Sequence, residues 1–479
     1  MKSRFLGQCS TIVVLGLTLY LINISCTNKH LIFPASDFFY PLQKSAQFSQ
    51  STPTKTTHLS QTTTAQSPTN LSHLVFGLLG SEKAWHHRKA YIESWWRPNA
   101  TRGFLFLDKA PSAEFLPWSV VSPPYKVSDD LTGFLNKSDL RAQRMVHGIM
   151  EVVREAGDQD LRWVVMGDDD SIFFVDNIVD VVAELDHTRY YYLGRPSELL
   201  LSTYLFSFDQ AFGGAGIMLS YALAKALARD MENCLKRYVF LNSADNTTKN
   251  CIADIGANLS PQMGNHQIDL RGDISGLLSS HPLAPLLSLH HFDAVHPIFP
   301  SKDRFDSTRH LMTAAAAEQS RMLQQTICYQ RQRNWSISIS WGYSAHIYEG
   351  LFPRSYLQKP IETFKPWCRI PRRPYFSFDT RPRSGDPCEA PHNFFFEFVE
   401  MATERREIIT TYSRAWPRAL PPCSSTGNYS ADGINTIQVY SPAAKRNRID
   451  RCECCDVVGM DNVRAQIRLR ECMADEIIA

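Results

Sequence analysis

The chain has 479 residues, with 50 Lys and Arg against 48 Asp and Glu, so its formal net charge at neutral pH is +2. Hydrophobic residues make up 44% and charged residues 20%, which excludes wholesale disorder, and the near balance of charge argues against a nucleic-acid partner. The sequence has a single long apolar run, which excludes a multi-span membrane protein, and its length predicts about two to three domains.

The N-terminal segment predicts a membrane anchor. No residue from 5 to 28 is charged, the centre at 12–22 is mostly apolar, and Lys2 and Arg4 precede it. About 20 apolar residues span a bilayer, and positive charge on the short side keeps that end in the cytosol. Residues 1–28 are therefore predicted to be a cytosolic tail and signal-anchor helix of type II topology. A cleaved signal peptide, ending near Ser25 and Cys26, is the alternative.

Residues 29–72 are predicted to form a stem. The part from 47 to 72 is rich in Ser, Thr and Gln and has no acidic residue, so it cannot bury enough apolar surface to fold. Setting aside Cys9 and Cys26, ten of the 12 cysteines remain, an even number that suits disulfides in an oxidising lumen. Acceptor sequences for N-glycosylation occur at Asn70, Asn99, Asn136, Asn246, Asn258, Asn334 and Asn428.

The segment 73–305 is predicted to be an α/β domain with a mostly parallel twisted sheet. Continuous apolar runs at 74–80, 103–107 and 163–166 indicate strands buried on both faces, and 118–121 is a weaker candidate. Helices are predicted after Ser81 and over about 138–156, and alternation of strands with helices favours a parallel sheet.

Three aspartates, Asp168, Asp169 and Asp170, directly follow the strand at 163–166 and Gly167. In open α/β sheets, ligands collect at the carboxyl ends of strands. Adjacent carboxylates repel one another unless a cation is present, and oxygen ligands suit Mg²⁺ or Mn²⁺. The pattern therefore predicts a divalent-metal site, with a solvated acidic turn or helix cap as the alternative.

Three strings together resemble a known family. They are Trp-Val-Val-Met-Gly-Asp-Asp-Asp-Ser at 163–171, Phe-Gly-Gly-Ala-Gly at 212–216 and Leu-His-His-Phe-Asp at 289–293, the last followed by Pro297 and Phe299. The chain resembles the Fringe-like β1,3-glycosyltransferases, and the last string resembles their plant-type branch. The resemblance implies a GT-A nucleotide-sugar-binding fold, a UDP-sugar donor, a Mn²⁺ (or Mg²⁺) ion and inversion at the anomeric carbon.

The resemblance also implies roles for individual residues. Metal ligation is expected from Asp170, with Asp168 beside it, and from His290, for which His266 is the alternative. Donor contacts are expected from polar residues that follow strands or lie on the first helix, and from glycines that let the backbone approach a ligand. These residues are Arg88, Asp108, Asp168, Asp169, Gly213, Gly214 and Gly216, with Asp129 and Asp130 as further candidates.

An inverting transfer needs a carboxylate that takes the proton from the acceptor hydroxyl. The family has a paired acidic motif after the glycine-rich loop, and this chain has Ala244 and Asp245 there. Asp245 is predicted to be the base, with Asp254 as the alternative. The sequon at Asn246 is a difficulty, because a glycan beside the base would obstruct the acceptor.

Residues 306–479 are predicted to form a β-rich accessory region stabilised by disulfides. Within it, strands are expected at 334–341, 375–378, 394–399, 408–412 and 436–440, and a helix at 313–321; a further helix is expected at 217–229, in the preceding domain. A disulfide is predicted between Cys234 and Cys251, and others among Cys328, Cys368, Cys388, Cys423 and the cluster Cys452, Cys454, Cys455 and Cys472. A zinc site in that cluster is the alternative.

Taken together, these features predict a Golgi membrane protein, single-pass type II, with a luminal catalytic region. Its function would be that of a Mn-dependent hexosyltransferase acting from a UDP-sugar on a glycan or glycoprotein acceptor. A catalytically inactive lectin-like or scaffold protein of the same fold is the alternative, since one acid of the paired motif is replaced by Ala244.

Overall fold

A computed structural model describes residues 67–370, 372–402, 404, 406–423, 429–446 and 450–478. The predicted anchor at 5–28 and the stem up to residue 66 lie outside these residues. Among the helices that are described, none combines the length and apolar character needed to cross a membrane. Thr69–Trp367 and Pro374–Ala479 form one compact unit, described below, and the described residues of Cys368–Arg373 form no helix or strand.

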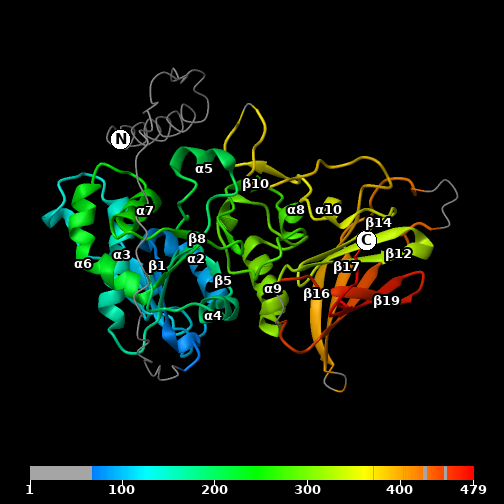
Figure 1. Ribbon diagram of the computed structural model, residues 1–479, viewed down its shortest axis with the longest axis horizontal. Coiled ribbons are helices and arrows are strands. Elements are labelled where there is room, and N and C mark those ends of the chain that lie inside the picture. The colour runs from blue at the N-terminus through cyan, green and yellow to red at the C-terminus, as the bar shows by residue number, and fades with distance from the viewer. Residues whose placement is uncertain are drawn as a thin grey trace, which may run out of the picture. The chain divides into compact units, whose positions relative to one another are not determined.

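The first part of this unit is built on a seven-stranded sheet with the order β3-β2-β1-β4-β7-β6-β8 (Figure 1). Strands β3, β2, β1 and β4 are parallel, β7 is antiparallel to both β4 and β6, and β8 is parallel to β6. The predicted α/β fold with a parallel sheet is thus confirmed, with one reversed strand. The strands are β1 Leu74–Leu79, β2 Gly103–Leu107, β3 Tyr125–Val127, β4 Trp163–Asp168, β6 Tyr192–Gly194, β7 Ile217–Ser220 and β8 Leu259–Pro261.

Helices flank this sheet. The Ser81 side chain accepts a hydrogen bond from the Ala84 amide and so caps the first long helix, as predicted. The apolar residues of α3 and α6 pack on one face of the sheet together with Val75, Val164 and Leu219. The helices are α2 Glu82–Trp95, α3 Arg141–Ala156, α4 Val175–Ala183, α5 Leu200–Phe206, α6 Tyr221–Arg237 and α7 Ala244–Asp254.

Two predictions for this part were wrong. The segment 118–121 is no strand, because the Trp118 ring stacks on Trp85 and its Nε1 donates to the Pro123 carbonyl, which closes a turn before β3. The segment 217–229 is not one helix. Its first four residues pair with β4, and the Ser220 side chain then caps α6.

Short strands beyond this sheet carry part of the candidate site. A three-stranded sheet has the order β5-β11-β9, and β10 pairs with β15. The helix predicted at 313–321 begins earlier, because Asp303 caps it with hydrogen bonds from two backbone amides. The elements are β5 Ile172–Phe173, β9 Asn265–His266, β10 Leu270–Gly272, α8 Ser275–Leu278, β11 Ser288–Leu289, α9 Arg304–Ala317, α10 Arg354–Leu357 and β15 Phe364–Pro366.

An eight-stranded sheet follows, with the order β12-β13-β14-β16-β17-β18-β20-β19. The strands predicted at 334–341, 394–399, 408–412 and 436–440 are found, whereas 375–378 makes only a single bridge between Phe376 and Leu199. The strands are β12 Gln325–Gln330, β13 Trp335–Ser340, β14 Ser344–Tyr348, β16 His392–Ala402, β17 Glu407–Arg414, β18 Thr436–Pro442, β19 Cys454–Met460 and β20 Arg464–Arg470.

Disulfides stabilise both parts. The predicted Cys234–Cys251 bond is present and joins α6 to α7. The other disulfides among the described residues are Cys328–Cys455, Cys388–Cys423 and Cys454–Cys472, so the late cysteines cannot form a four-cysteine zinc site. Cys452 is a buried thiol.

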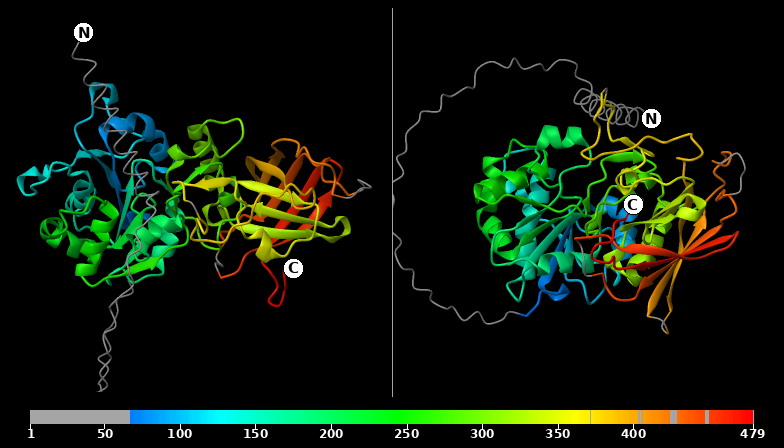
Figure 2. Two further views of the ribbon diagram at one scale, coloured as in Figure 1. Left: turned by 90° about the horizontal axis from the view of Figure 1, so that it is seen from above. Right: turned by 45° about the vertical axis from the view of Figure 1, so that its right-hand side comes forward.

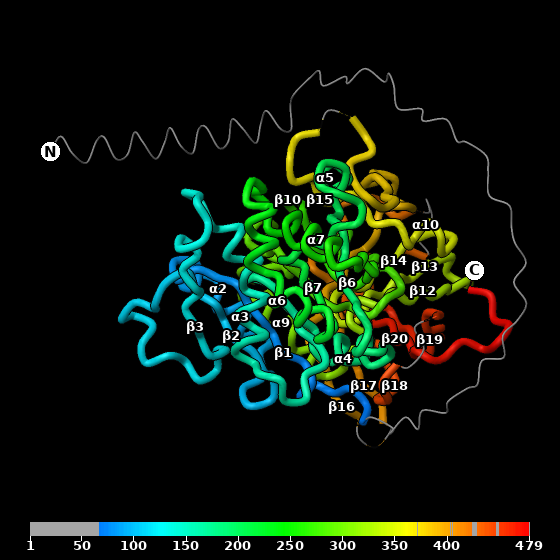
Figure 3. The backbone as a smooth tube through the Cα atoms, turned by 60° about the vertical axis from the view of Figure 1, so that its left-hand side comes forward, coloured from blue at the N-terminus to red at the C-terminus, as the bar shows by residue number. Residues whose placement is uncertain are grey.

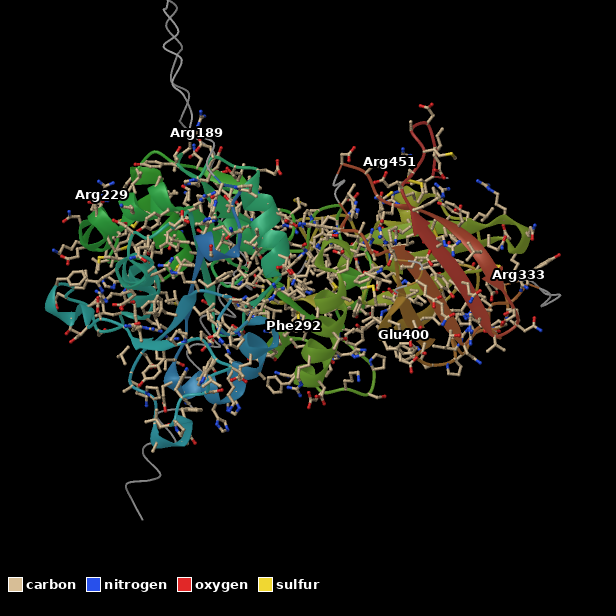
Figure 4. All side chains as sticks on the ribbon, turned by 90° about the horizontal axis from the view of Figure 1, so that it is seen from below. Arg189, Arg229, Phe292, Arg333, Glu400 and Arg451 are labelled. Atoms are coloured by element: carbon tan, nitrogen blue, oxygen red, sulfur yellow. A yellow bond between two sulfur atoms is a disulfide. The ribbon has the colours of Figure 1, made fainter. Side chains whose placement is uncertain are left out.

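One hydrophobic core joins the two sheets. It contains Phe76 and Val165 of the first sheet together with Ile337 and Ile467 of the second. Phe292, labelled in Figure 4, belongs to this core and lies between the two sheets. The left view of Figure 2 shows the yellow-green residues between the blue and cyan residues of the first part and the orange and red C-terminal sheet. The domain boundaries predicted at 72/73 and 305/306 stay predictions.

Candidate active site and metal centre

The three aspartates lie between the seven-stranded sheet and the three-stranded sheet β5-β11-β9. Asp168 is the last residue of β4, and the turn Asp169-Asp170 leads into β5. Strand β11 pairs antiparallel with β5, with Leu289 opposite Ile172. His290 therefore leaves β11 at the point where the aspartate turn enters β5, although the two segments are far apart in sequence.

Asp168, Asp170 and His290 form a group with the geometry of a metal site. The Nε2 atom of His290 lies 3.1 Å from Asp170 Oδ1 and 3.6 Å from Asp168 Oδ2, and one ligand atom from each residue lies within 4.8 Å of the other two. Asp170 and His290 are buried, and Asp170 Oδ2 has no hydrogen-bond partner among the described residues. Two carboxylates and an imidazole fit Mn²⁺ or Mg²⁺, and an ion would supply the partner that this buried oxygen lacks.

The electrostatics of the three aspartates also favour a cation. Burial and the neighbouring charges of Asp170 and Asp169 raise the pKa of Asp168 well above its ordinary value. Burial would also raise the pKa of Asp170, but the His290 ring and the Arg88 guanidinium hold it below the ordinary value. Negative charge thus gathers in a site with little solvent, where a divalent ion relieves the repulsion.

Arg88 and Asp169 hold the aspartate turn in place. Arg88 Nη1 donates to Asp169 Oδ1 at 2.6 Å and lies 3.2 Å from Asp170 Oδ1, while Arg88 Nε donates to Asp293 Oδ2. Asp293 also accepts from the Tyr91 hydroxyl and from Arg304 Nη1. Arg88 therefore reaches the acidic turn from α2, and its predicted contact with the donor stays a prediction.

The loop at 212–216 fits around the site because three of its residues are glycines. A Cβ atom on Gly214 would lie 2.1 Å from His290 Cε1, and one on Gly213 would lie 3.0 Å from Asp245 Oδ1. Gly216 has φ +88°, a conformation that glycine adopts without strain. The Ser171 hydroxyl donates to the Gly214 carbonyl at 2.7 Å and ties the loop to the aspartate turn.

Asp245 faces the same region. It lies in the first turn of α7, which Ser243 caps, and its Oδ1 accepts a hydrogen bond from the Gly213 amide at 2.7 Å. Asp245, Asp168 and Gly213 line one cavity, together with apolar residues of α3 and the central sheet. Burial raises the pKa of Asp245 to about 6, although the Gly213 amide acts in the opposite direction.

The alternative residues lie elsewhere. Asp254 is at the other end of α7, where it pairs with Arg237 at 2.7 Å and accepts from the Tyr238 hydroxyl. His266 is buried with its Nδ1 3.0 Å from Glu198 Oε1, and it is not part of the metal group. Geometry therefore favours Asp245 and His290.

Asp108, Asp129 and Asp130, which are predicted to contact the donor, each bind neighbouring protein groups. Asp108 Oδ1 accepts from the Glu82 amide at the start of α2, and Asp130 caps a short helical turn. Asp129 pairs with Arg154 at 2.6 Å. Their donor role stays a prediction.

Sequence reasoning missed three residues beside the metal group. His291 has φ +59°, its ring stacks on Trp367 at 4.9 Å, and its Nδ1 lies 3.3 Å from Asp269 Oδ1. Asp269 in turn accepts from the Ser197 hydroxyl. The adjacent histidines were a signal for His291, but nothing in the sequence connects it to Asp269 or to Trp367.

The Asn246 side chain is half-buried, and its Oδ1 accepts a hydrogen bond from Asn250 Nδ2. The sequon asparagines Asn70, Asn99, Asn136, Asn258 and Asn334 are exposed, and Asn428 lies outside the described residues. An unmodified Asn246 would leave the approach to Asp245 free of a glycan.

We expect Gly214→Ala to weaken metal binding at least about tenfold, because the new Cβ displaces the His290 ring from the two carboxylates. The measurement is a calorimetric titration of Mn²⁺ into the full-length protein. Gly133→Ala is the matched control, since a Cβ at Gly133 meets no atom within 4 Å, and it should leave the affinity unchanged. Equal affinity in both variants would show that His290 does not hold the ion.

Comparison with known proteins identifies the family. A family model described as "Protein of unknown function, DUF604" matches residues 202–455, more than half of the sequence. The chain belongs to this family. A second model, described as Fringe-like, matches residues 127–261 of this DUF604 protein, which include the aspartate triple, the glycine-rich loop and Asp245. The predicted resemblance to the Fringe-like glycosyltransferases is confirmed. The resemblance to their plant-type branch stays a prediction.

Among solved structures, the DUF604 chain is similar to the crystal structure of mouse xyloside xylosyltransferase 1 in its apo form. The similarity has 12% sequence identity and a TM-score of 0.24, and covers 42% of this chain and 86% of that chain. These values are too low to carry an argument about function. No curated protein matches the sequence.

Proposed function

We propose that this protein is an inverting glycosyltransferase that moves a sugar from a UDP-sugar to a hydroxyl group of a glycan or glycoconjugate. One observation carries the proposal. The group Asp168, Asp170 and His290 lies at the carboxyl end of β4, and Asp245 lines the same cavity as Asp168. A family match to Fringe-like proteins over residues 127–261, which include Asp168, Asp170 and Asp245, supports it.

The metal group would act on the donor. Asp168, Asp170 and His290 would hold Mn²⁺ or Mg²⁺, and such an ion, when bound, neutralises charge on the departing diphosphate. Arg88 holds the aspartate turn through Asp169, so that the Asp170 carboxylate stays directed at His290. Preorganised charge of this kind costs no rearrangement during the reaction.

Asp245 would act on the acceptor. In a single displacement the acceptor oxygen bonds to the anomeric carbon, the bond from that carbon to UDP breaks, and UDP leaves with the electron pair. Asp245 takes the proton of the acceptor hydroxyl. Its pKa of about 6 leaves the carboxylate ionised at neutral pH yet basic enough to accept a proton, and the Gly213 amide fixes its orientation.

The proposal includes a β1,3 linkage, a hexosyl donor and a location in the Golgi membrane with the catalytic region in the lumen. The N-terminal apolar run and the Ser, Thr and Gln-rich segment support the location. The four disulfides among the described residues support an oxidising compartment. The linkage and the donor class rest on the family resemblance.

An assay of UDP release tests the proposal. The full-length protein would be incubated with Mn²⁺ and a panel of UDP-sugars, with and without glycan acceptors. We expect release from at least one donor, loss of release on chelation of the metal, and restoration by added Mn²⁺. Absence of release from every donor, with the protein folded and Mn²⁺ present, would contradict the proposal and favour the lectin-like or scaffold alternative.

A further inference from the structure

A second group of metal-ligating side chains lies away from the candidate active site. Asp129 follows β3 by two residues, and His147 and Glu151 lie one turn apart on α3. Helix α3 packs on β1 and β2, and β2 pairs with β3. These elements form the blue and cyan part of Figure 3. Side chains four residues apart share one face of a helix, so His147 and Glu151 both face the segment that carries Asp129.

The three side chains converge. His147 Nδ1 lies 3.9 Å from Asp129 Oδ2 and 3.9 Å from Glu151 Oε1, and one ligand atom from each residue lies within 4.8 Å of the other two. The residue His147 is 2% exposed and Glu151 is 0% exposed. These distances are slightly longer than the spacing of about 3.3 Å between ligands on a tetrahedral ion with bonds near 2 Å, so small side-chain shifts close the site.

Two buried atoms of this group lack partners. His147 Nδ1 and Glu151 Oε2 make no hydrogen bond with any described residue. Buried polar atoms are nearly always satisfied, because each unsatisfied one costs about 1–3 kcal/mol. Two such atoms, one nitrogen and one carboxylate oxygen, therefore indicate a ligand that accepts electron pairs from both.

The surroundings hold the group in place. Arg154 binds Asp129 through two hydrogen bonds, Nη1 to Oδ2 at 2.6 Å and Nη2 to Oδ1 at 3.1 Å. The Asp129 amide donates to Glu151 Oε1 at 2.6 Å. With Arg154 included, two carboxylates and one guanidinium leave one negative charge when both acids are ionised, which suits a cation.

We propose that Asp129, His147 and Glu151 bind a second divalent transition-metal ion, of the Zn²⁺ or Mn²⁺ class. The ion ties α3 to the segment after β3. Two carboxylates and an imidazole are ligands that both ions accept. Asp129 is also a candidate donor contact, but this site shares no residue with the group Asp168, Asp170 and His290 or with Asp245, and it does not depend on the proposed function.

Counting bound ions tests the proposal. The metal-free full-length protein would be dialysed against Zn²⁺ and, separately, against Mn²⁺, and the ions bound per chain would be measured. His147→Gln and Glu151→Gln, each made alone, should lose one ion per chain relative to wild type with at least one of the two metals. Asp139→Asn, at an exposed acid outside the group, is the matched control and should lose none.

Thermal unfolding supplies the second readout. The metal should raise the melting temperature of Asp170→Asn, in which the second site is intact, by more than it raises that of Asp170→Asn with Glu151→Gln. If His147→Gln and Glu151→Gln are folded and bind as many ions as wild type, the proposal is wrong. If Asp170→Asn leaves the ion count unchanged while Glu151→Gln lowers it, the proposed metal site at Asp170 is contradicted and the second site is supported.

Discussion

Replacement of Asp170 by Asn is expected to lower UDP-sugar turnover by at least about 1000-fold and to abolish the dependence of UDP binding on Mn²⁺. Asp170 is the fully buried carboxylate of the metal group, and its Oδ2 is the oxygen without a partner. An amide carries no charge to offset a cation, so the ion would be lost together with the neutralisation that it supplies. The measurements are calorimetric titration of UDP with and without Mn²⁺, and initial rates of UDP release.

The fold should tolerate this change. Arg88 keeps its partners Asp169 and Asp293 in the variant, so the melting temperature of the metal-free protein should change little. Asp254→Asn is the matched control, because Asp254 pairs with Arg237 at the far end of α7, and it should keep full turnover. Mn²⁺-dependent UDP binding that persists in Asp170→Asn would place the metal elsewhere.

Replacement of Asp245 by Ala is expected to lower kcat by about 10²- to 10⁴-fold and to leave the KM for the UDP-sugar nearly unchanged. A methyl group cannot take the acceptor proton, and Ala, unlike Asn, creates no new glycosylation sequon with Asn246 and Thr247. In the wild type, kcat/KM should rise as the pH rises through about 6, because the ionised carboxylate is the active form and burial raises its pKa to that value. The variant should lose this limb of the pH profile.

The neighbouring residue supplies the control for Asp245. Asn246→Gln removes the sequon but keeps an amide side chain, and it should leave kcat unchanged if Asn246 carries no glycan. A rise in kcat would show that a glycan obstructs the acceptor. If Asp245→Ala keeps the wild-type kcat and the rise of kcat/KM near pH 6, another group takes the proton.

Much of the architecture could be predicted from sequence because it depends on local pattern. Apolar runs that are buried on both faces predicted β1, β2 and β4, and alternation of polar and apolar residues predicted β13. The position of the three aspartates directly after β4 predicted that they lie at the carboxyl end of the sheet. Each of these features depends on residues that are neighbours along the chain, so the sequence alone is enough to predict it.

Local pattern failed where distant residues decide the conformation. The run 217–220 has helical neighbours, yet it is a strand because β4 and β6 offer it hydrogen-bonding partners on both sides. At 375–378 the aromatic residues resemble a strand, but Phe376 packs against Phe364 and finds only one bridge to Leu199. Intrinsic preference for a strand is weak beside the availability of a partner edge.

The sequence by itself determined which kinds of side chain the site contains: an acidic triple, a glycine-rich loop, candidate bases and candidate histidines. Only the tertiary structure selected among them. The antiparallel pairing of β11 with β5 brings His290 to Asp170, while Glu198 binds His266. The Gly213 amide orients Asp245 into the cavity shared with Asp168, while Arg237 binds Asp254. These choices depend on contacts between segments that are far apart in sequence, and such contacts leave no periodic signal in the chain itself.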